Sequence, residues 1–175
     1  MRYAAFLRAV NLGANRRVTS AELREIFEDV GAEEVATFRT SGNVVFEAPR
    51  DMAAQIEKAL ESVLGYDVGV FTRTAKELAE IAAAQPFKPA QVKASNGKLQ
   101  VSMLAAKPSA AARKQVLALA TDDDLLTFGK RELFWLPSGG TLESTLDRKA
   151  IDKLLGPTTM RTKGTVEQLT AKFFA

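Results

Sequence analysis

The sequence contains no cysteine and no histidine in its 175 residues. The absence of cysteine excludes disulfide bonds, thiolate nucleophiles and thiolate metal sites. The absence of histidine excludes the usual general base at neutral pH, the Ser-His-Asp triad and the commonest ligand of transition metals. Any catalysis would have to use carboxylate, lysine, arginine, hydroxyl or backbone groups. We therefore expect no transition-metal site and no cofactor.

Long hydrophobic runs are also missing. No stretch approaches the roughly 20 apolar residues of a membrane-spanning helix, and the opening MRYAAFLRAV is too short and too interrupted for a signal peptide. The composition, 46% hydrophobic and 26% charged, is typical of a globular protein. The net charge of +3 is spread over 24 basic and 21 acidic residues, so only local clustering would attract a polyanion. We expect a cytoplasmic protein with no membrane partner.

Hydrophobic periodicity divides the first half into alternating strands and helices. The helix over 19–31 is marked by a Thr19/Glu22 capping box and by Gly31 at its end. The trailing helix is stopped by Pro86. The predicted order is strand, helix, hairpin, helix, strand and helix, over residues 2–10, 19–31, 35–48, 51–65, 66–73 and 74–85.

The same order begins again after residues 87–97, whose proline, serine, asparagine and glycine are typical of a connector. The last helix has a candidate Thr165/Gln168 capping box. Two series of identical element order indicate a duplication. The second series covers residues 98–106, 109–120, 124–136, 144–156, 158–162 and 165–174.

This element order predicts an α+β fold of two tandem ferredoxin-like (βαββαβ) units, each with a trailing helix. Residues 1–86 form the first unit, 87–97 the connector and 98–175 the second unit. Because one such unit has a thin core, we expect the two to pack together.

The core residues of the first unit can also be predicted. Helical spacing places Met52, Ala59 and Val63 on the apolar face of the helix over 51–65. The predicted core of the first unit contains Phe6, Leu23, Ile26, Phe27, Val44, Phe46, Ile56 and Leu60.

Several stretches, taken together, carry a family resemblance. They are FLRAVNLG with RRVTSAELREIFEDVG, then TFRTSGNVVFE, AAAQPF and TLDRKAIDKLLGPTTMRTKGTVEQL. In this order and spacing they resemble the bacterial family called domain of unknown function 1697, nearly end to end. The resemblance implies two ferredoxin-like halves in a small bacterial cytoplasmic protein, with no established activity. One loop reads Gly13-Ala14-Asn15, where family members often have a second glycine and a basic residue.

One edge of the first predicted sheet gathers basic and turn-forming residues. The first two strands of such a unit run parallel, so the loop after the first and the turn after the second leave the same edge. Guanidinium groups, an amide, a hydroxyl and the free N–H groups of a helix suit a phosphate or carboxylate. The turn at Gly65 and Tyr66 lies on the same edge. The predicted ligand-binding residues are Arg8, Asn11, Gly13, Arg16, Arg17, Arg39, Ser41, Gly42 and Asn43.

These residues also have structural interpretations. Arg16 and Arg17 fit a solvated loop, and the segment Ser41-Gly42-Asn43 fits an ordinary hairpin turn. Arg8 interrupts an apolar strand, where a charge costs free energy unless it is paired. We therefore expect Arg8 to bind a ligand or to form a structural salt bridge, and the sequence does not separate the two.

A second candidate site lies before the last helix. Arg161 and Lys163 precede the predicted cap Thr165, which would bring cations to a helix N-terminus. The alternative is a plain strand end and helix cap. The acidic run Asp122 to Asp124 indicates a solvated turn rather than a hard-metal site.

Five aromatic residues fall in predicted strands, and core packing explains them better than stacking on RNA bases does. They are Phe6, Phe46, Phe71, Phe134 and Trp135.

Three functions stay open. The leading one is a binding module for a phosphate-bearing ligand, either nucleic acid or nucleotide. The second is an enzyme that acts on an anionic small molecule, with Glu22, Asp147 or a lysine as acid or base. The third is a regulatory protein-interaction module.

Overall fold

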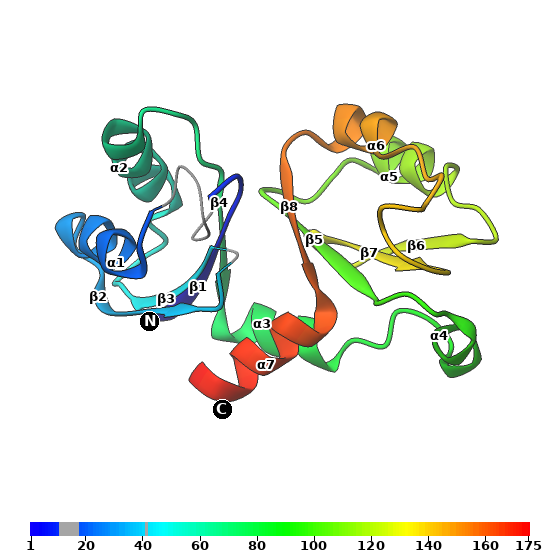
Figure 1. The fold of residues 1–175 in the computed structure, drawn as a ribbon, viewed down its shortest axis with the longest axis horizontal. Helices are drawn as coiled ribbons and strands as arrows, with labels where there is room; N and C mark the ends of the chain where they lie inside the picture. Colours follow the sequence, from blue (N-terminus) through cyan, green and yellow to red (C-terminus); the bar gives the residue numbers. More distant parts are fainter. Residues whose placement is uncertain (11–17, 41) are drawn as a thin grey trace. The chain divides into compact units, whose positions relative to one another are not determined.

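The computed structural model describes residues 1–10, 18–40 and 42–175. It contains two four-stranded sheets in which neighbouring strands are antiparallel (Figure 1). The first sheet has the order β2-β3-β1-β4, and the second has the order β6-β7-β5-β8. The strands are β1 (Arg2–Leu7), β2 (Glu33–Phe38), β3 (Asn43–Glu47), β4 (Val70–Thr74), β5 (Gln100–Leu104), β6 (Asp124–Phe128), β7 (Glu132–Pro137) and β8 (Thr158–Thr162).

The helices complete two series with the same element order. The order β1-α1-β2-β3-α2-β4-α3 recurs as β5-α5-β6-β7-α6-β8-α7, in line with the predicted duplication. Within the described residues, no helix is both long and apolar enough to cross a membrane. The helices are α1 (Ser20–Asp29), α2 (Ala53–Leu64), α3 (Ala75–Ala83), α4 (Pro89–Ala94), α5 (Ala110–Leu117), α6 (Arg148–Leu155) and α7 (Lys163–Phe173).

Helix α4 lies in the stretch whose composition predicts a connector. Pro89 occupies its first turn, where the missing N–H group costs nothing, and the Gln91 side chain accepts a bond from the Lys88 N–H at 3.0 Å. The helix is too short to produce a sustained apolar period, which is why periodicity missed it.

The chain divides into two compact units, Met1–Ala79 with Leu169–Ala175, and Glu80–Gln168. The division falls inside α3 and inside α7. The end of α7 belongs to the first unit, where Arg2 Nη1 donates to the Phe173 carbonyl at 2.8 Å. The Phe173 ring also meets the Phe38 ring edge to face, at 6.0 Å between centroids.

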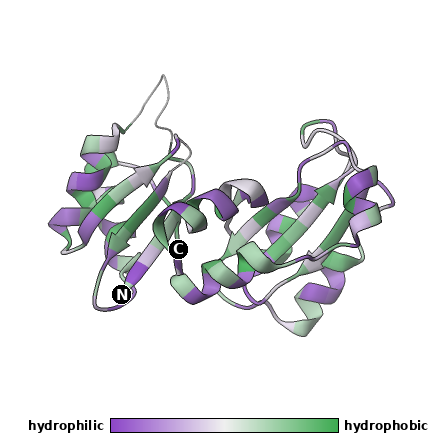
Figure 2. Ribbon diagram, turned by 90° about the horizontal axis from the view of Figure 1, so that it is seen from below, coloured by the Kyte–Doolittle hydropathy of each residue, from purple (hydrophilic) through white to green (hydrophobic). Residues whose placement is uncertain are grey.

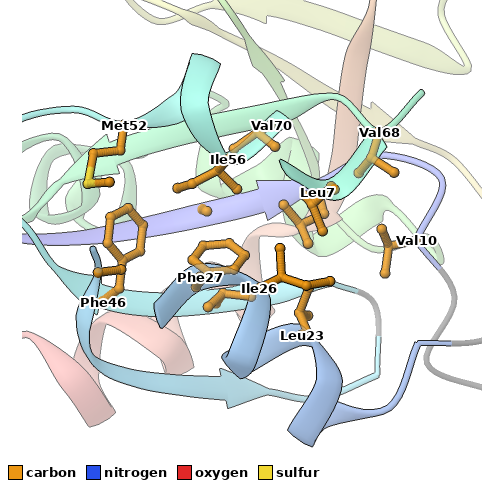
Figure 3. Close-up of a cluster of buried hydrophobic side chains, with 14 of the residues drawn as sticks. Leu7, Val10, Leu23, Ile26, Phe27, Phe46, Met52, Ile56, Val68 and Val70 are labelled. Carbon is orange, nitrogen blue, oxygen red and sulfur yellow. The ribbon is translucent and has the colours of Figure 1, made fainter. Parts of the chain in front are cut away.

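The core of the first unit lies between one face of its sheet and helices α1 and α2 (Figure 3). All eight residues predicted for this core are buried. Phe6 is buried on the other face of the sheet. Tyr3, Ala5 and Leu7 belong to the core cluster, and the alternation of side chains along β1 turns Phe6 away from it. The prediction for Val63 is wrong, because it lies 65% exposed in the last turn of α2 while Leu64 contacts the core.

The second unit has a core of its own, built from β5, β6, β7, α5 and α6. Trp135 lies in it, and its indole Nε1 donates to Asp124 Oδ1 at 2.9 Å. The Ser144 hydroxyl donates to the same oxygen at 2.7 Å, so Asp124 is buried with its charge hydrogen-bonded rather than solvated. The prediction of a solvated turn is therefore wrong for Asp124. Figure 2 shows hydrophobic residues along the strands and mixed hydropathy along the helices.

Candidate functional site

The predicted ligand edge of the first unit is built from the ends of β1 and β2. Both strands pair antiparallel with β3, so they run parallel to each other and end at one edge. The Leu7 N–H donates to the Gly42 carbonyl at 2.8 Å, and the Arg8 N–H donates to the Gly69 carbonyl at 2.8 Å. These two bonds connect the end of β1 to the hairpin turn on one side and to the approach to β4 on the other. We call this region the β1–β2 edge.

The backbone of the β1–β2 edge adopts several conformations with positive φ. Ala9 has φ 66° and Arg39 has φ 61°, both unusual for residues with a side chain. Gly42 and Gly65 have φ 80° and 78°. Positive φ at a residue other than glycine costs of order 1 kcal/mol, and such residues cluster at functional sites. Glu34, inside β2, also has positive φ, at 50°. Sequence reasoning found the glycines and missed Ala9, because alanine gives no signal for this conformation.

Arg8 lies outside the strand in which it was predicted. Strand β1 ends at Leu7, and the Arg8 side chain is exposed to solvent. Its charge therefore carries no burial cost, and the argument that Arg8 must be paired inside an apolar strand is wrong. The cause is the turn at Ala9, which ends β-sheet pairing and directs the chain out of the sheet.

Arg39 is the second exposed arginine of the edge. Its guanidinium carbon lies 5.3 Å from the centroid of the Phe38 ring, and Lys172 Nζ lies 5.8 Å from the same ring. Phe38, Phe173 and the two cations thus form a small basic and aromatic cluster within the first unit. Sequence reasoning missed Lys172 and Phe173, because they come from the far end of the chain.

Asn43 has a structural partner. It is fully buried, and its Nδ2 donates to the Phe38 carbonyl at 2.9 Å, which closes the hairpin between β2 and β3. Gly42 is buried as well, and a Cβ there would lie 3.1 Å from the Leu7 Cβ. These two residues shape the turn that carries Arg39. The other predicted members of the edge lie outside the described residues: Asn11, Gly13, Arg16, Arg17 and Ser41.

The second candidate site forms hydrogen bonds within the second unit. Lys163 is buried, and its amine donates to Glu167 Oε1 at 2.7 Å and to the Ala82 carbonyl at 3.0 Å. Arg161 is also buried, and its Nη1 donates to Thr159 Oγ1 at 2.7 Å and to the Met160 carbonyl at 2.8 Å. Burial lowers the pKa of Arg161 to about 10. These contacts favour the structural interpretation of the segment.

Thr165 does not cap the last helix. Helix α7 begins at Lys163, and Thr162 Oγ1 accepts a bond from the Thr165 N–H at 3.2 Å. Thr165 is therefore in the first turn, with its hydroxyl 2.8 Å from that of Thr162. The same arrangement begins α3, where Thr74 Oγ1 accepts from the Glu77 N–H at 3.2 Å. The prediction used the Thr-x-x-Gln pattern that begins at Thr165, and this placed the start of the helix about one turn after the threonine that caps it, Thr162.

Both carboxylates considered as acid or base cap helices. Glu22 Oε2 accepts from the Thr19 N–H at 3.0 Å, which completes the predicted capping box of α1. Asp147 Oδ1 accepts from the Ala150 N–H at 3.0 Å at the start of α6. Within residues 1–10, 18–40 and 42–175, no group of three acidic side chains is arranged to hold a metal ion.

The five strand aromatics for which we predict core packing are all buried. Their exposed fractions are at most 4%. They are Phe6, Phe46, Phe71, Phe134 and Trp135.

Comparison with known proteins identifies the family. The family described as "Protein of unknown function (DUF1697)" matches residues 1–134, more than half of the chain. The chain belongs to the DUF1697 family. Among solved structures, the chain is similar to the conserved bacterial protein SP0830 from Streptococcus pneumoniae, with 23% identity, 97% of each chain covered and a TM-score of 0.63. At this identity the likeness shows the fold alone. No curated protein matches.

Proposed function

We propose that this DUF1697 protein binds a phosphate-bearing ligand, a nucleotide or a nucleic acid, at the β1–β2 edge. The observation that carries the proposal is the placement of two exposed arginines, Arg8 and Arg39, after two parallel strands of one sheet. Arginine offers several N–H donors and no acceptor, which suits a phosphate oxygen.

The spacing of the two arginines supports the same conclusion. One strand, β3, separates β1 from β2, so the strand ends lie about 10 Å apart at the usual strand spacing. Two long side chains at this separation can converge on one phosphate or each hold one phosphate of a longer ligand. Asp67 also lies exposed near this edge, and a carboxylate there favours a ligand that carries a hydroxyl or base donor besides its phosphates.

The strained backbone gives independent support. Ala9 directly follows Arg8, and Arg39 itself has positive φ, so both arginines are presented from conformations that cost free energy. The bonds from Leu7 to Gly42 and from Arg8 to Gly69 hold these conformations in place. Such pre-organisation lowers the entropic cost of ligand binding.

We also infer that each repeated unit, 1–86 and 98–175, is a ferredoxin-like plait. Residues 87–97 connect the two units. The strand order β2-β3-β1-β4, its repetition and the antiparallel pairing support this assignment. That the two units pack together stays a prediction.

A thermal-shift screen tests the proposed function. Nucleotides, phosphorylated metabolites and short oligonucleotides are added to the protein, and a ligand that binds only the folded state raises Tm. We expect a phosphate-bearing compound to raise Tm and its dephosphorylated form to have no effect. If no phosphate-bearing compound raises Tm, the proposal is wrong. Product formation from the stabilising compound would instead support the enzyme alternative.

The double variant Arg8→Met/Arg39→Met locates the site. Methionine keeps much of the side-chain volume and removes the charge, so the variant should fold and lose the ligand-induced shift. The matched control is Arg24→Met/Arg50→Met, which removes two exposed arginines of the first unit from other positions. Equal loss in both variants would show a general charge effect and contradict the assignment.

A further inference from the structure

Helix α5 of the second unit presents a basic and apolar surface to solvent. Lys107, Lys114 and Leu117 are exposed there, and Arg113 is partly exposed. Val116 is the one fully buried residue of this eight-residue helix, so most of its side chains face outward. A shallow groove of about 630 Å³ runs along it. The groove, here called the α5 surface, is lined by Lys107, Pro108, Ala110, Arg113, Lys114 and Leu117.

The charge of the α5 surface has one sign. Its lining contains three cationic side chains and no carboxylate. The Arg113 guanidinium lies 5.2 Å from the centroid of the Phe128 ring, and its Nη2 lies 3.5 Å from the Gly129 carbonyl. These contacts hold Arg113 beside Phe128 and the turn at Gly129, where it lines the groove. An acidic partner would therefore meet a positioned guanidinium and two exposed ammonium groups.

The floor of the same groove is apolar. Pro108 and Ala110 contribute small apolar surfaces, and Leu117 is 41% exposed beside them. The lining contains no aromatic residue on which a nucleic-acid base could stack. The surface thus fits an occupant with both carboxylates and an aliphatic side chain.

The duplicated helix shows that the fold does not require this surface. Helix α1 occupies the equivalent place in the first unit, and its exposed side includes Glu22, Glu25 and Glu28. It also buries three residues, where α5 buries one. Helix α5, with the sequence AAARKQVL, has no acidic residue at all. The two copies of one structural element therefore differ at their solvent faces. The exposed residues of α1 include several glutamates, whereas those of α5 include basic and apolar residues.

We propose that the α5 surface binds an acidic, amphipathic peptide segment of a partner protein. Carboxylates of the segment meet Lys107, Arg113 and Lys114, and an aliphatic side chain packs on Leu117 and Pro108. This site is separate from the β1–β2 edge and does not depend on a phosphate-bearing ligand. The charge complementarity and the apolar floor together select a peptide rather than a bare polyanion.

Fluorescence anisotropy with a short labelled peptide of glutamate and leucine tests the proposal on the full chain. The wild type should bind this peptide, and affinity should fall as salt rises because the charges are exposed. Lys107→Glu/Lys114→Glu should weaken binding by about tenfold or more, since two attractions become repulsions. The matched control Lys149→Glu/Lys153→Glu, on exposed positions of α6, should bind as the wild type does.

A second pair of measurements tests the apolar floor. Leu117→Ser should weaken binding of the glutamate and leucine peptide, and a peptide with serine in place of each leucine should bind the wild type more weakly. Leu117→Ser and Lys107→Glu/Lys114→Glu both alter exposed side chains of the protein, so circular dichroism should show that each variant folds as the wild type does. The proposal is overturned if the wild type does not bind the peptide, or if the serine peptide binds equally well. It is also overturned if a single-stranded oligonucleotide binds as tightly and Leu117→Ser has no effect on peptide binding.

Discussion

Arginine occurs in this chain in two opposite environments. Arg8 and Arg39 are exposed at the ends of strands, whereas Arg73 and Arg161 are buried at the fourth positions of β4 and β8. Arg73 Nη1 donates to the Thr72 carbonyl at 2.8 Å, which parallels the bond from Arg161 to Met160. The buried arginines have protein partners and serve the fold, whereas the exposed pair belongs to the site proposed at the β1–β2 edge. Arg73-Thr74 and Arg161-Thr162 occupy the same places in the two repeated strands.

At the residue scale, the surroundings of Gly42 and Gly65 predict different losses of stability when each glycine is replaced by alanine. Gly42→Ala and Gly65→Ala both force alanine to positive φ, which costs about 1 kcal/mol. At Gly65 a Cβ meets no atom within 4 Å, whereas at Gly42 it lies 3.1 Å from the Leu7 Cβ. We expect Gly42→Ala to lower the free energy of unfolding by about 2 kcal/mol or more, and Gly65→Ala by about half of that. Urea denaturation measures both, and equal losses would contradict the crowding at Gly42.

At the scale of the elements, capping residues determine where helices begin. Thr19, Thr74 and Thr162 each accept a bond from the N–H group three residues later. Thr162→Ala should lower the free energy of unfolding by about 1 kcal/mol, and Thr162→Ser should keep the hydroxyl and have little effect. Thermal or urea unfolding measures the difference. If Thr162→Ala is neutral, then Thr162 does not cap α7.

Most elements of this fold could be predicted from the sequence, because each has a strong local signal. The alternation of apolar residues predicts the strands, and the spacing of Leu23, Ile26 and Phe27 predicts the buried face of α1. Element ends were harder to predict. Strand β1 stops at Leu7 because Ala9 turns out of the sheet, and alanine carries no turn signal.

The candidate site was only partly predictable, for a different physical reason. The topology brings Arg8 and Arg39 to one edge, and an argument from parallel strands can anticipate that. No local signal brings Phe173 and Lys172 to Phe38, because that contact depends on where the last helix ends in space. The burial of Asn43 and Lys163 likewise depends on tertiary partners, so sequence reasoning could not separate structural polar residues from available ones.

At the scale of the whole molecule, the absence of histidine and cysteine predicts a weak dependence of stability on pH near neutrality. No side chain of the chain has an ordinary pKa between about 5 and 8. The pKa of Arg161 is lowered to about 10 by burial, so Arg161 is protonated in both the folded and the unfolded state below pH 9. Its contribution changes only above pH 10, where the unfolded state holds the proton longer and stability rises with pH.

The free energy of unfolding should therefore vary by less than about 1 kcal/mol between pH 6 and 9. Urea denaturation at several pH values in this range, at constant ionic strength, measures it. A steep change across this interval would contradict the prediction.

An NMR titration with ATP locates the proposed anion site, because backbone amides report binding residue by residue. We expect the largest shifts at the β1–β2 edge, at the amides of Arg8, Ala9, Arg39, Gly42 and Gly69. These shifts should disappear in Arg8→Met/Arg39→Met and persist in Arg24→Met/Arg50→Met. Shifts confined to the segment around Arg161 and Lys163, or no shifts with ATP at millimolar concentration, would contradict an anion site at this edge.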